Sequence, residues 1–77
     1  MNLDDFIKKM AEQFEDADAV NFNADTEYKT LDEWSSMMVL SIMAMIDNEY
    51  KVQIKGTTIR NADTIGDLYN AVKELVP

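Results

Sequence analysis

The sequence predicts an all-α fold, a small helical bundle of three long helices with one short helix before the last. Apolar residues recur at a spacing of three and four in separate stretches, which is the period of an amphipathic helix. Only residues 51–56 alternate like a strand, and a single strand has nothing with which to pair. The chain has 77 residues and no low-complexity linker, so we expect one domain spanning residues 1–77.

The first helix is expected over residues 2–15. Asn2 is a good N-cap, and Asp5 follows three residues later, in the position of a capping box. Apolar side chains gather on one helical face, and the polar residues opposite are expected to be solvated. The apolar positions are Leu3, Phe6, Ile7, Met10 and Phe14.

The connection from residue 16 to residue 35 has no sustained period. A connection of this length is unusual inside a compact domain unless it has a structural or functional role. Scattered apolar residues should pin it to the helices, and these are Val20, Phe22, Tyr28, Leu31 and Trp34.

The same connection allows a calcium interpretation. Asp16, Asp18 and Glu27 occupy positions one, three and twelve of an EF-hand-like loop. However, Val20 and Asn21 stand where such a loop needs a ligand and a glycine. We therefore expect no metal site, with these acidic residues facing water.

The second long helix is expected from about Ser36 to Tyr50. One face gathers Val39, Ile42, Met43, Ile46 and Tyr50, which should form the core side. The other apolar residues flank polar positions, and an exposed apolar strip there would bind a partner. The alternative is a helix buried nearly all round. The predicted partner-binding residues are Met37, Met38, Leu40, Ser41, Ala44, Met45 and Asn48.

The last third of the chain predicts an extended connection and then two helices. Val52 and Ile54 should turn inward, and residues 57–61 should form the short helix. Thr64 is the expected N-cap of the final helix, with Asp67 in capping-box position. Its inner face comprises Ile65, Leu68, Tyr69, Val72 and Val76.

Composition narrows the functional classes. The chain has no cysteine and no histidine, which removes the common nucleophile, general base and metal ligands, so we expect no enzyme. Its net charge of −8 opposes binding to nucleic acids or anionic membranes and favours basic partner surfaces. No apolar run is long enough to span a bilayer, and the first residues lack the pattern of a signal peptide. We expect a cytoplasmic monomer.

Two serines stand where the polar connection turns into the apolar second helix. Ser35 suits the N-cap, because its hydroxyl can accept a hydrogen bond from a first-turn backbone N–H group. Ser36 then lies in the first turn, near the positive end of the helix dipole, where a phosphate is favoured. Ser36 is therefore a plausible attachment point for an anionic group.

The run Trp34-Ser35-Ser36-Met37 resembles the attachment site of acyl carrier proteins and peptidyl carrier domains, whose pattern reads Trp-Asp-Ser-Leu. The start of the final helix, Thr64-Ile65-Gly66-Asp67, is similar to the Thr-Val-Gly-Asp of that family. A long first loop with apolar anchors fits the same family, so the resemblance covers the whole chain. Ser35 departs from the family's aspartate and lacks its charge.

The resemblance implies that Ser36 carries a 4′-phosphopantetheine arm, supplied from coenzyme A by a phosphopantetheinyl transferase. The arm's thiol would hold acyl or aminoacyl groups as thioesters for acyl-transferring, ligase or condensing enzymes. The second helix has few carboxylates for a carrier of fatty-acid synthesis, which implies apolar docking and a specialised pathway. The alternative is a degenerate, unmodified carrier-like domain that acts as a protein-interaction module.

Overall fold

The computed structural model describes residues 1–14 and 21–76, and within them the chain is helical with no strand. The helices are α1 (Leu3–Glu12), α2 (Ser36–Tyr50), α3 (Gly56–Asn61) and α4 (Ile65–Leu75), with a short 3-10 helix, η2 (Tyr28–Thr30), in the first connection. The predicted bundle of three long helices and one short helix is therefore confirmed.

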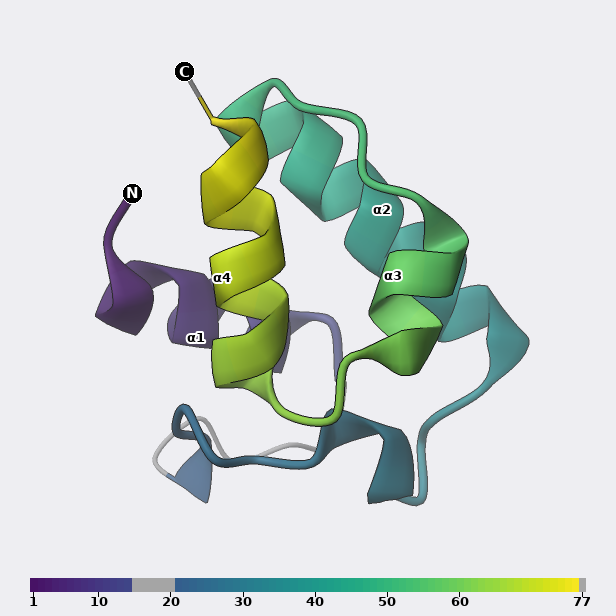
Figure 1. The fold of residues 1–77 in the computed structure, drawn as a ribbon. Coiled ribbons are helices and arrows are strands. Elements are labelled where there is room, and N and C mark those ends of the chain that lie inside the picture. The colour runs from purple at the N-terminus through teal and green to yellow at the C-terminus, as the bar shows by residue number, and fades with distance from the viewer. Residues whose placement is uncertain (15–20, 77) are drawn as a thin grey trace.

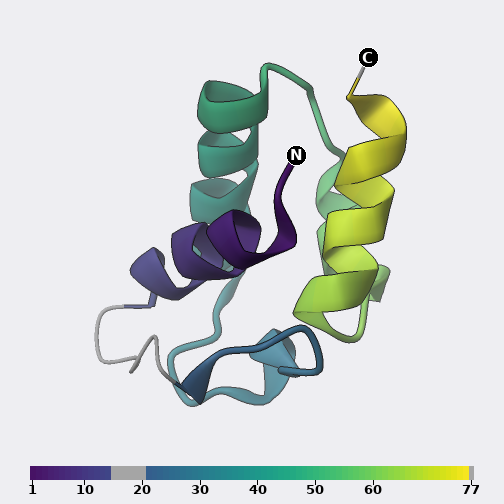
Figure 2. The same cartoon turned by 90° about the vertical axis from the view of Figure 1, so that its left-hand side faces the viewer.

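The helices form an open arrangement around one core. In Figure 2, α2 and α4 stand on either side and α1 crosses in front of α2, while the segment that contains η2 runs beneath. The extended residues 51–55 lead back from the end of α2 to α3, so that α4 begins near η2 (Figure 1). Both α2 and α4 thus start at the end of the molecule where the long connection lies.

The core contains the inner faces that the periodicity predicts. Ile42, Ile46, Leu68 and Val72 are fully buried, and Ile54 of the extended connection joins them at 5% exposure. The remaining buried members are Phe6, Met10, Phe14, Tyr28, Val39, Met45, Ile59 and Ile65. Each fully buried aliphatic side chain of this kind contributes about 1.5–3 kcal/mol relative to exposure.

The helix ends show which capping signals act. The Asn2 side chain accepts a hydrogen bond from the Asp5 backbone N–H at 3.0 Å, so α1 is capped as predicted. Thr64 and Asp67 form the full capping box at α4, with bonds of 3.1 and 3.3 Å. At the other end of α2, Lys51 adopts a left-handed conformation with φ of 59°.

The long connection holds the adjoining ends of α3 and α4. The Tyr28 hydroxyl donates to the Ile59 carbonyl at 2.6 Å, and the Lys29 ammonium donates to the Arg60 carbonyl at 2.6 Å. In the opposite sense, the carbonyls of residues 24 and 26 accept from the first backbone N–H groups of α4, at 2.8 and 3.0 Å. Backbone groups that the two helices leave unpaired are thereby satisfied by one segment.

The predicted loop anchors behave as expected where they are described. Tyr28 is fully buried, while Phe22, Leu31 and Trp34 are half-buried and pack against the core. The Phe22 ring lies 5.6 Å from that of Phe14, which ties the connection to the end of α1. Val20 lies outside the described residues, as do Asp16 and Asp18 of the calcium interpretation.

Substitution of Gly66 provides a first test of whether the hydrogen bonds between the long connection and α4 stabilise the fold. A Cβ atom at Gly66 would lie 3.0 Å from the Ala24 carbonyl oxygen, which is the acceptor for its own backbone N–H. Gly66→Ala should therefore lower the free energy of unfolding by about 1 kcal/mol, since overpacking outweighs the reduced entropy of the unfolded chain. Urea denaturation measures the change.

Gly56→Ala is the matched control for this substitution. Its Cβ would meet Val39 Cγ1 at 3.4 Å and Met43 Sδ at 3.6 Å, which are ordinary contacts with side chains. Stability should stay the same or rise by up to about 1 kcal/mol. Equal losses of stability in the two variants would show that the close approach of the added Cβ atom to Ala24 does not destabilise the fold.

Tyr28 provides a second test, through pH. Burial, together with the nearby charges of Asp67 and Asp63, raises the pKa of Tyr28 well above its ordinary value of 10.0. The contribution of the protonated hydroxyl to stability is fully present below pH 10.0, and it is lost as the pH rises because the unfolded chain ionises first. Tyr28→Phe should lower stability at pH 7 by roughly 1–3 kcal/mol and flatten the decline above pH ~10.

Tyr50→Phe is the control for Tyr28→Phe. The Tyr50 hydroxyl oxygen is buried and has no hydrogen-bond partner in the described part of the chain. Removing it should leave stability at pH 7 unchanged or slightly raised, because no bond is lost. Thermal unfolding at pH 7 compares the two variants; burial also raises the pKa of Tyr50, so Tyr50→Phe serves as the control at neutral pH. A Tyr28→Phe protein as stable as the parent at pH 7 would contradict the proposed anchor.

Candidate functional site

Ser36 is the first residue of α2, and its side chain is exposed. Its hydroxyl makes no hydrogen bond to the described residues, so the oxygen is accessible to a modifying enzyme. The preceding residue, Ser35, is extended with φ −156° and ψ 171°, which directs the chain into the helix. The structure therefore places the candidate serine at the predicted helix start.

Ser35 occupies the N-cap position, but the prediction that its hydroxyl caps the helix is wrong. Within the described residues no side-chain hydrogen bond caps the start of α2, and the Ser35 carbonyl accepts from the Met38 N–H at 3.0 Å. The first turn of α2 also contains no acidic residue. The positive end of the helix dipole is consequently not neutralised by a side chain of its own helix, which favours an anion nearby.

Aromatic contacts fix the approach to Ser36. The Trp34 N–H donates to the Leu31 carbonyl at 2.9 Å, and the Trp34 ring lies 5.5 Å from the Tyr28 ring. Because Tyr28 is itself bonded to α3, the chain just before the serine is tied to the core. Ser36 therefore follows a segment whose position is fixed by contacts with the core.

The outer face of α2 carries an apolar strip, although a narrower one than predicted. Met37 is 76% exposed and Leu40 64% exposed, which is high for large apolar side chains. Of the other predicted positions, Ala44 and Asn48 are exposed, and Met38 and Ser41 are half-buried. We define the apolar strip as Met37, Leu40 and Ala44.

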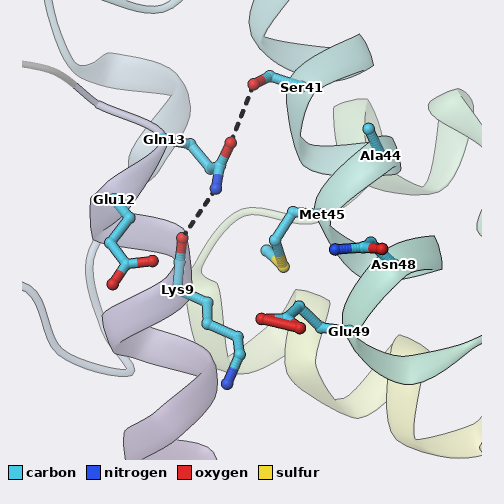
Figure 3. A pocket seen from close by; sticks show the side chains of 8 residues that line it. All are labelled: Lys9, Glu12, Gln13, Ser41, Ala44, Met45, Asn48 and Glu49. Atoms are coloured by element: carbon cyan, nitrogen blue, oxygen red, sulfur yellow. Dashed lines mark hydrogen bonds between the residues drawn. The ribbon is translucent and has the colours of Figure 1, made fainter.

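Met45 does not belong to this exposed strip. Its exposure is 9%, and it is part of the core cluster, so the prediction that placed it on the partner-binding face is wrong. The physical reason is α1, which crosses α2 (Figure 2), so that Met45 lies between the two helices (Figure 3). Helical periodicity cannot show how wide a sector a crossing helix will bury.

A groove of about 540 Å³ runs between α1 and α2 beside the strip (Figure 3). Met45 lies between the two helices, and Gln13 reaches across the gap toward Ser41. We call this the α1–α2 groove, and its lining residues are Lys9, Glu12, Gln13, Ser41, Ala44, Met45, Asn48 and Glu49. Apart from the alanine and the methionine, these side chains are polar or charged.

Hydrogen bonds organise the walls of the α1–α2 groove. The Ser41 hydroxyl donates to Gln13 Oε1 at 2.9 Å, and Gln13 Nε2 donates to the Lys9 carbonyl at 3.2 Å. The Lys9 ammonium pairs with Asp5 and lies 5.8 Å from the centre of the Tyr50 ring. The hydrogen bond to Asp5 raises the pKa of Lys9 above its ordinary value, so the ammonium stays charged.

A second groove, of about 570 Å³, lies on the opposite flank of α2. It is formed with the extended connection and is lined by Met43, Ala44, Asp47, Gln53, Ile54 and Lys55. Asp47 and Lys55 give this groove one charge of each sign. Ala44 lines both grooves, so the apolar strip separates them.

The contribution of α1 to this site was not predicted from the sequence. Lys9 and Glu12 were expected on a solvated face, and Gln13 was not singled out. One signal was available, since Gln13 follows the apolar Met10 by three residues and thus borders the buried stripe. Its partner Ser41 is 28 residues away, however, and no local pattern identifies such a pair.

Other kinds of site receive no support from the described residues. They contain no group of three or more acidic, histidine or cysteine side chains placed to hold a metal ion. In the same part of the chain, none of the helices combines the length and the apolar character that crossing a bilayer requires. Comparison of the chain with protein-family models, curated proteins and solved structures finds no match.

Proposed function

We propose that this protein is an acyl carrier whose Ser36 bears a 4′-phosphopantetheine arm. The observation that carries the proposal is the exposed Ser36 hydroxyl, which bonds to none of the described residues, at the start of an apolar helix and two residues after the anchored Trp34. The likeness of this run, and of the start of α4, to carrier proteins supplies the identity of the arm. Helix order and spacing are compatible with that family.

The local electrostatics support a phosphodiester at Ser36. The first turn of α2 lacks an acidic side chain, so a phosphate there would meet the positive end of the dipole without a repelling neighbour in that turn. Such a contact is worth about 0.3–1 kcal/mol at an exposed position. A phosphopantetheinyl transferase would transfer the arm from coenzyme A: a bond forms between the Ser36 hydroxyl oxygen and the phosphorus next to the arm, and the pyrophosphate P–O bond breaks. Adenosine 3′,5′-bisphosphate leaves, and the hydroxyl proton passes to a base of the transferase.

In this proposal the protein does no chemistry itself. The arm would hold an acyl or aminoacyl group as a thioester, and the tether would raise its effective concentration at a bound partner enzyme. Acyl-transferring, ligase or condensing enzymes would dock on the apolar strip, which offers Met37 and Leu40 in place of carboxylates. This apolar character favours a specialised biosynthetic pathway in the cytoplasm.

The second candidate is an unmodified interaction module. The same exposed strip supports it, because Met37 and Leu40 could bind a partner whether or not Ser36 carries an arm. Methionine is suited to such contacts, since its side chain is flexible and polarisable. The two candidates differ in one measurable property, the covalent mass at Ser36.

Intact-mass spectrometry tests the carrier proposal. Incubation with coenzyme A and a broad-specificity phosphopantetheinyl transferase should add one arm to the protein, and Ser36→Ala should abolish the addition. Because the Ser35 hydroxyl caps nothing, Ser35→Ala should still be modified and should change stability by less than about 0.5 kcal/mol. Ser35→Asp adds the family's charge and should speed modification.

Two results would contradict this assignment. Modification of Ser36→Ala together with loss of modification in Ser35→Ala would place the arm on the neighbouring serine. No addition to the parent protein by any transferase would favour the unmodified interaction module.

Charge substitutions test the apolar strip. Met37→Glu and Leu40→Glu should each reduce the rate at which a partner enzyme uses the carrier while leaving the melting temperature nearly unchanged, because both side chains are mostly exposed. Met45→Glu is the matched control, and it should destabilise the fold by several kcal/mol (roughly 2–5), since it buries a carboxylate in the core. Unfolding of Met37→Glu or Leu40→Glu would show that the strip is structural.

A further inference from the structure

The methionines of this chain differ sharply in their exposure to solvent. The sequence contains six of them, and five lie in helices. The side chain of Met37 is 76% exposed, against 42% for Met1. The others are half-buried or buried among the core residues, namely Met10, Met38, Met43 and Met45. Met37 is therefore the methionine that a reagent dissolved in water meets most readily.

Met37 also stands where a chemical change alters the surface and spares the core. It directly follows Ser36, and in the apolar strip it is the sulfur-containing member beside Leu40 and Ala44. Because most of the Met37 side chain lies in water, the packing of the fold depends little on it. A polar group introduced at this position would change the strip and leave the core intact.

The thioether of an exposed methionine can be oxidised by hydrogen peroxide. A lone pair of the sulfur attacks one peroxide oxygen, so that an S–O bond forms and the O–O bond breaks. The sulfur is oxidised and the peroxide is reduced, and the leaving hydroxide takes up the proton of the transferred oxygen and departs as water. The product is a polar sulfoxide, which methionine sulfoxide reductases convert back to the thioether.

We propose that Met37 is a site of reversible oxidation, and that its sulfoxide makes the apolar strip polar beside Ser36. The sulfoxide oxygen accepts hydrogen bonds from water, and an apolar partner surface would remove that water without replacing the bonds. Leu40 has no group that peroxide oxidises in this way, so the response depends on one sulfur atom. The consequence for partner enzymes rests on the proposed function, whereas the site of oxidation does not.

Limited oxidation of the folded, unmodified protein tests the site. Samples treated with hydrogen peroxide are digested, and mass spectrometry with fragmentation follows the sulfoxide at each methionine over time. Oxidation of Met37 should be on the order of tenfold faster than that of Met10 or Met45, because a buried sulfur reacts only in locally opened molecules. In urea-unfolded protein the rates should converge, since no sulfur is then protected.

Three variants isolate the effect of the sulfoxide on the strip. Met37→Gln supplies a polar side chain, Met37→Leu keeps an apolar one without a sulfur, and Met38→Leu is the matched control at the half-buried neighbour. At the time when the parent has gained one oxygen, its retention on a hydrophobic-interaction column should be shorter. Met38→Leu should respond like the parent, and Met37→Leu should keep its retention. Melting temperatures should stay nearly unchanged.

Arm addition by a phosphopantetheinyl transferase measures the effect on a partner, because an enzyme that reaches Ser36 also meets Met37. The Met37 sulfoxide should slow arm addition about fivefold, which corresponds to the loss of roughly one small apolar contact. Untreated Met37→Gln should be similarly slow. A methionine sulfoxide reductase should restore the rate of the oxidised parent, and peroxide should not slow Met37→Leu.

Three results would overturn the inference: oxidation of a buried methionine as fast as that of Met37, a retention of the parent that peroxide does not change, or equal rates of arm addition before and after oxidation. Absence of arm addition to the untreated parent would contradict the proposed function instead. The oxidation rates and the column retention would then still decide whether Met37 is the oxidised site and whether its sulfoxide makes the strip polar.

Discussion

The hydrogen bond from the buried Tyr28 hydroxyl to the Ile59 carbonyl holds the connection against the short helix α3. A helix of six residues is far below the length at which a helix is stable alone, and α3 has no side-chain cap at its start. Tyr28 and Lys29 stabilise α3 from its other end, because they donate hydrogen bonds to carbonyls at its C-terminal end. The same segment then accepts from the first N–H groups of α4. The position of α4 against the core therefore depends on a segment with almost no regular structure.

The anchoring of Tyr28 also affects the candidate attachment serine, Ser36. Tyr28 contacts Trp34 through their rings, and Trp34 stands two residues before Ser36. One aromatic side chain thus links the start of α2 to the end of α3, where its partner Ile59 lies 31 residues after Tyr28 in the sequence. Loosening Tyr28 would free the approach to Ser36, and it would leave buried carbonyls at α3 without a donor. Stability and the presentation of Ser36 are coupled through this contact.

The sequence predicts helices here far better than it predicts contacts. The bounds of α2 and the capping box at Thr64 follow from local chemistry, because apolar period and cap residues act within one or two turns. Ser35 shows the limit of such reasoning, since a suitable residue in the N-cap position makes no capping bond. Met45 shows another limit, because its burial is decided by α1 crossing from elsewhere in the chain.

Only part of the candidate site could likewise be predicted from the sequence. Ser36 and the exposed Met37 and Leu40 could be identified from the sequence, because each depends only on its place along one helix. The α1–α2 groove could not, since it arises where two helices diverge and is bridged by the bond between Ser41 and Gln13. Its two carboxylates, Glu12 and Glu49, come from different helices and are brought to one groove only by the fold.

The two flanks of α2 suggest why docking and attachment can be separate properties of one helix. Ser36 lies at the start of α2, and the groove residues Asn48 and Glu49 lie in its last turn. Attraction to Glu12 and Glu49 would weaken with salt, whereas contact with Met37 and Leu40 would not. Partner selection by charge at Glu49 could then change without altering the surroundings of Ser36, because Glu49 and the serine stand at opposite ends of α2.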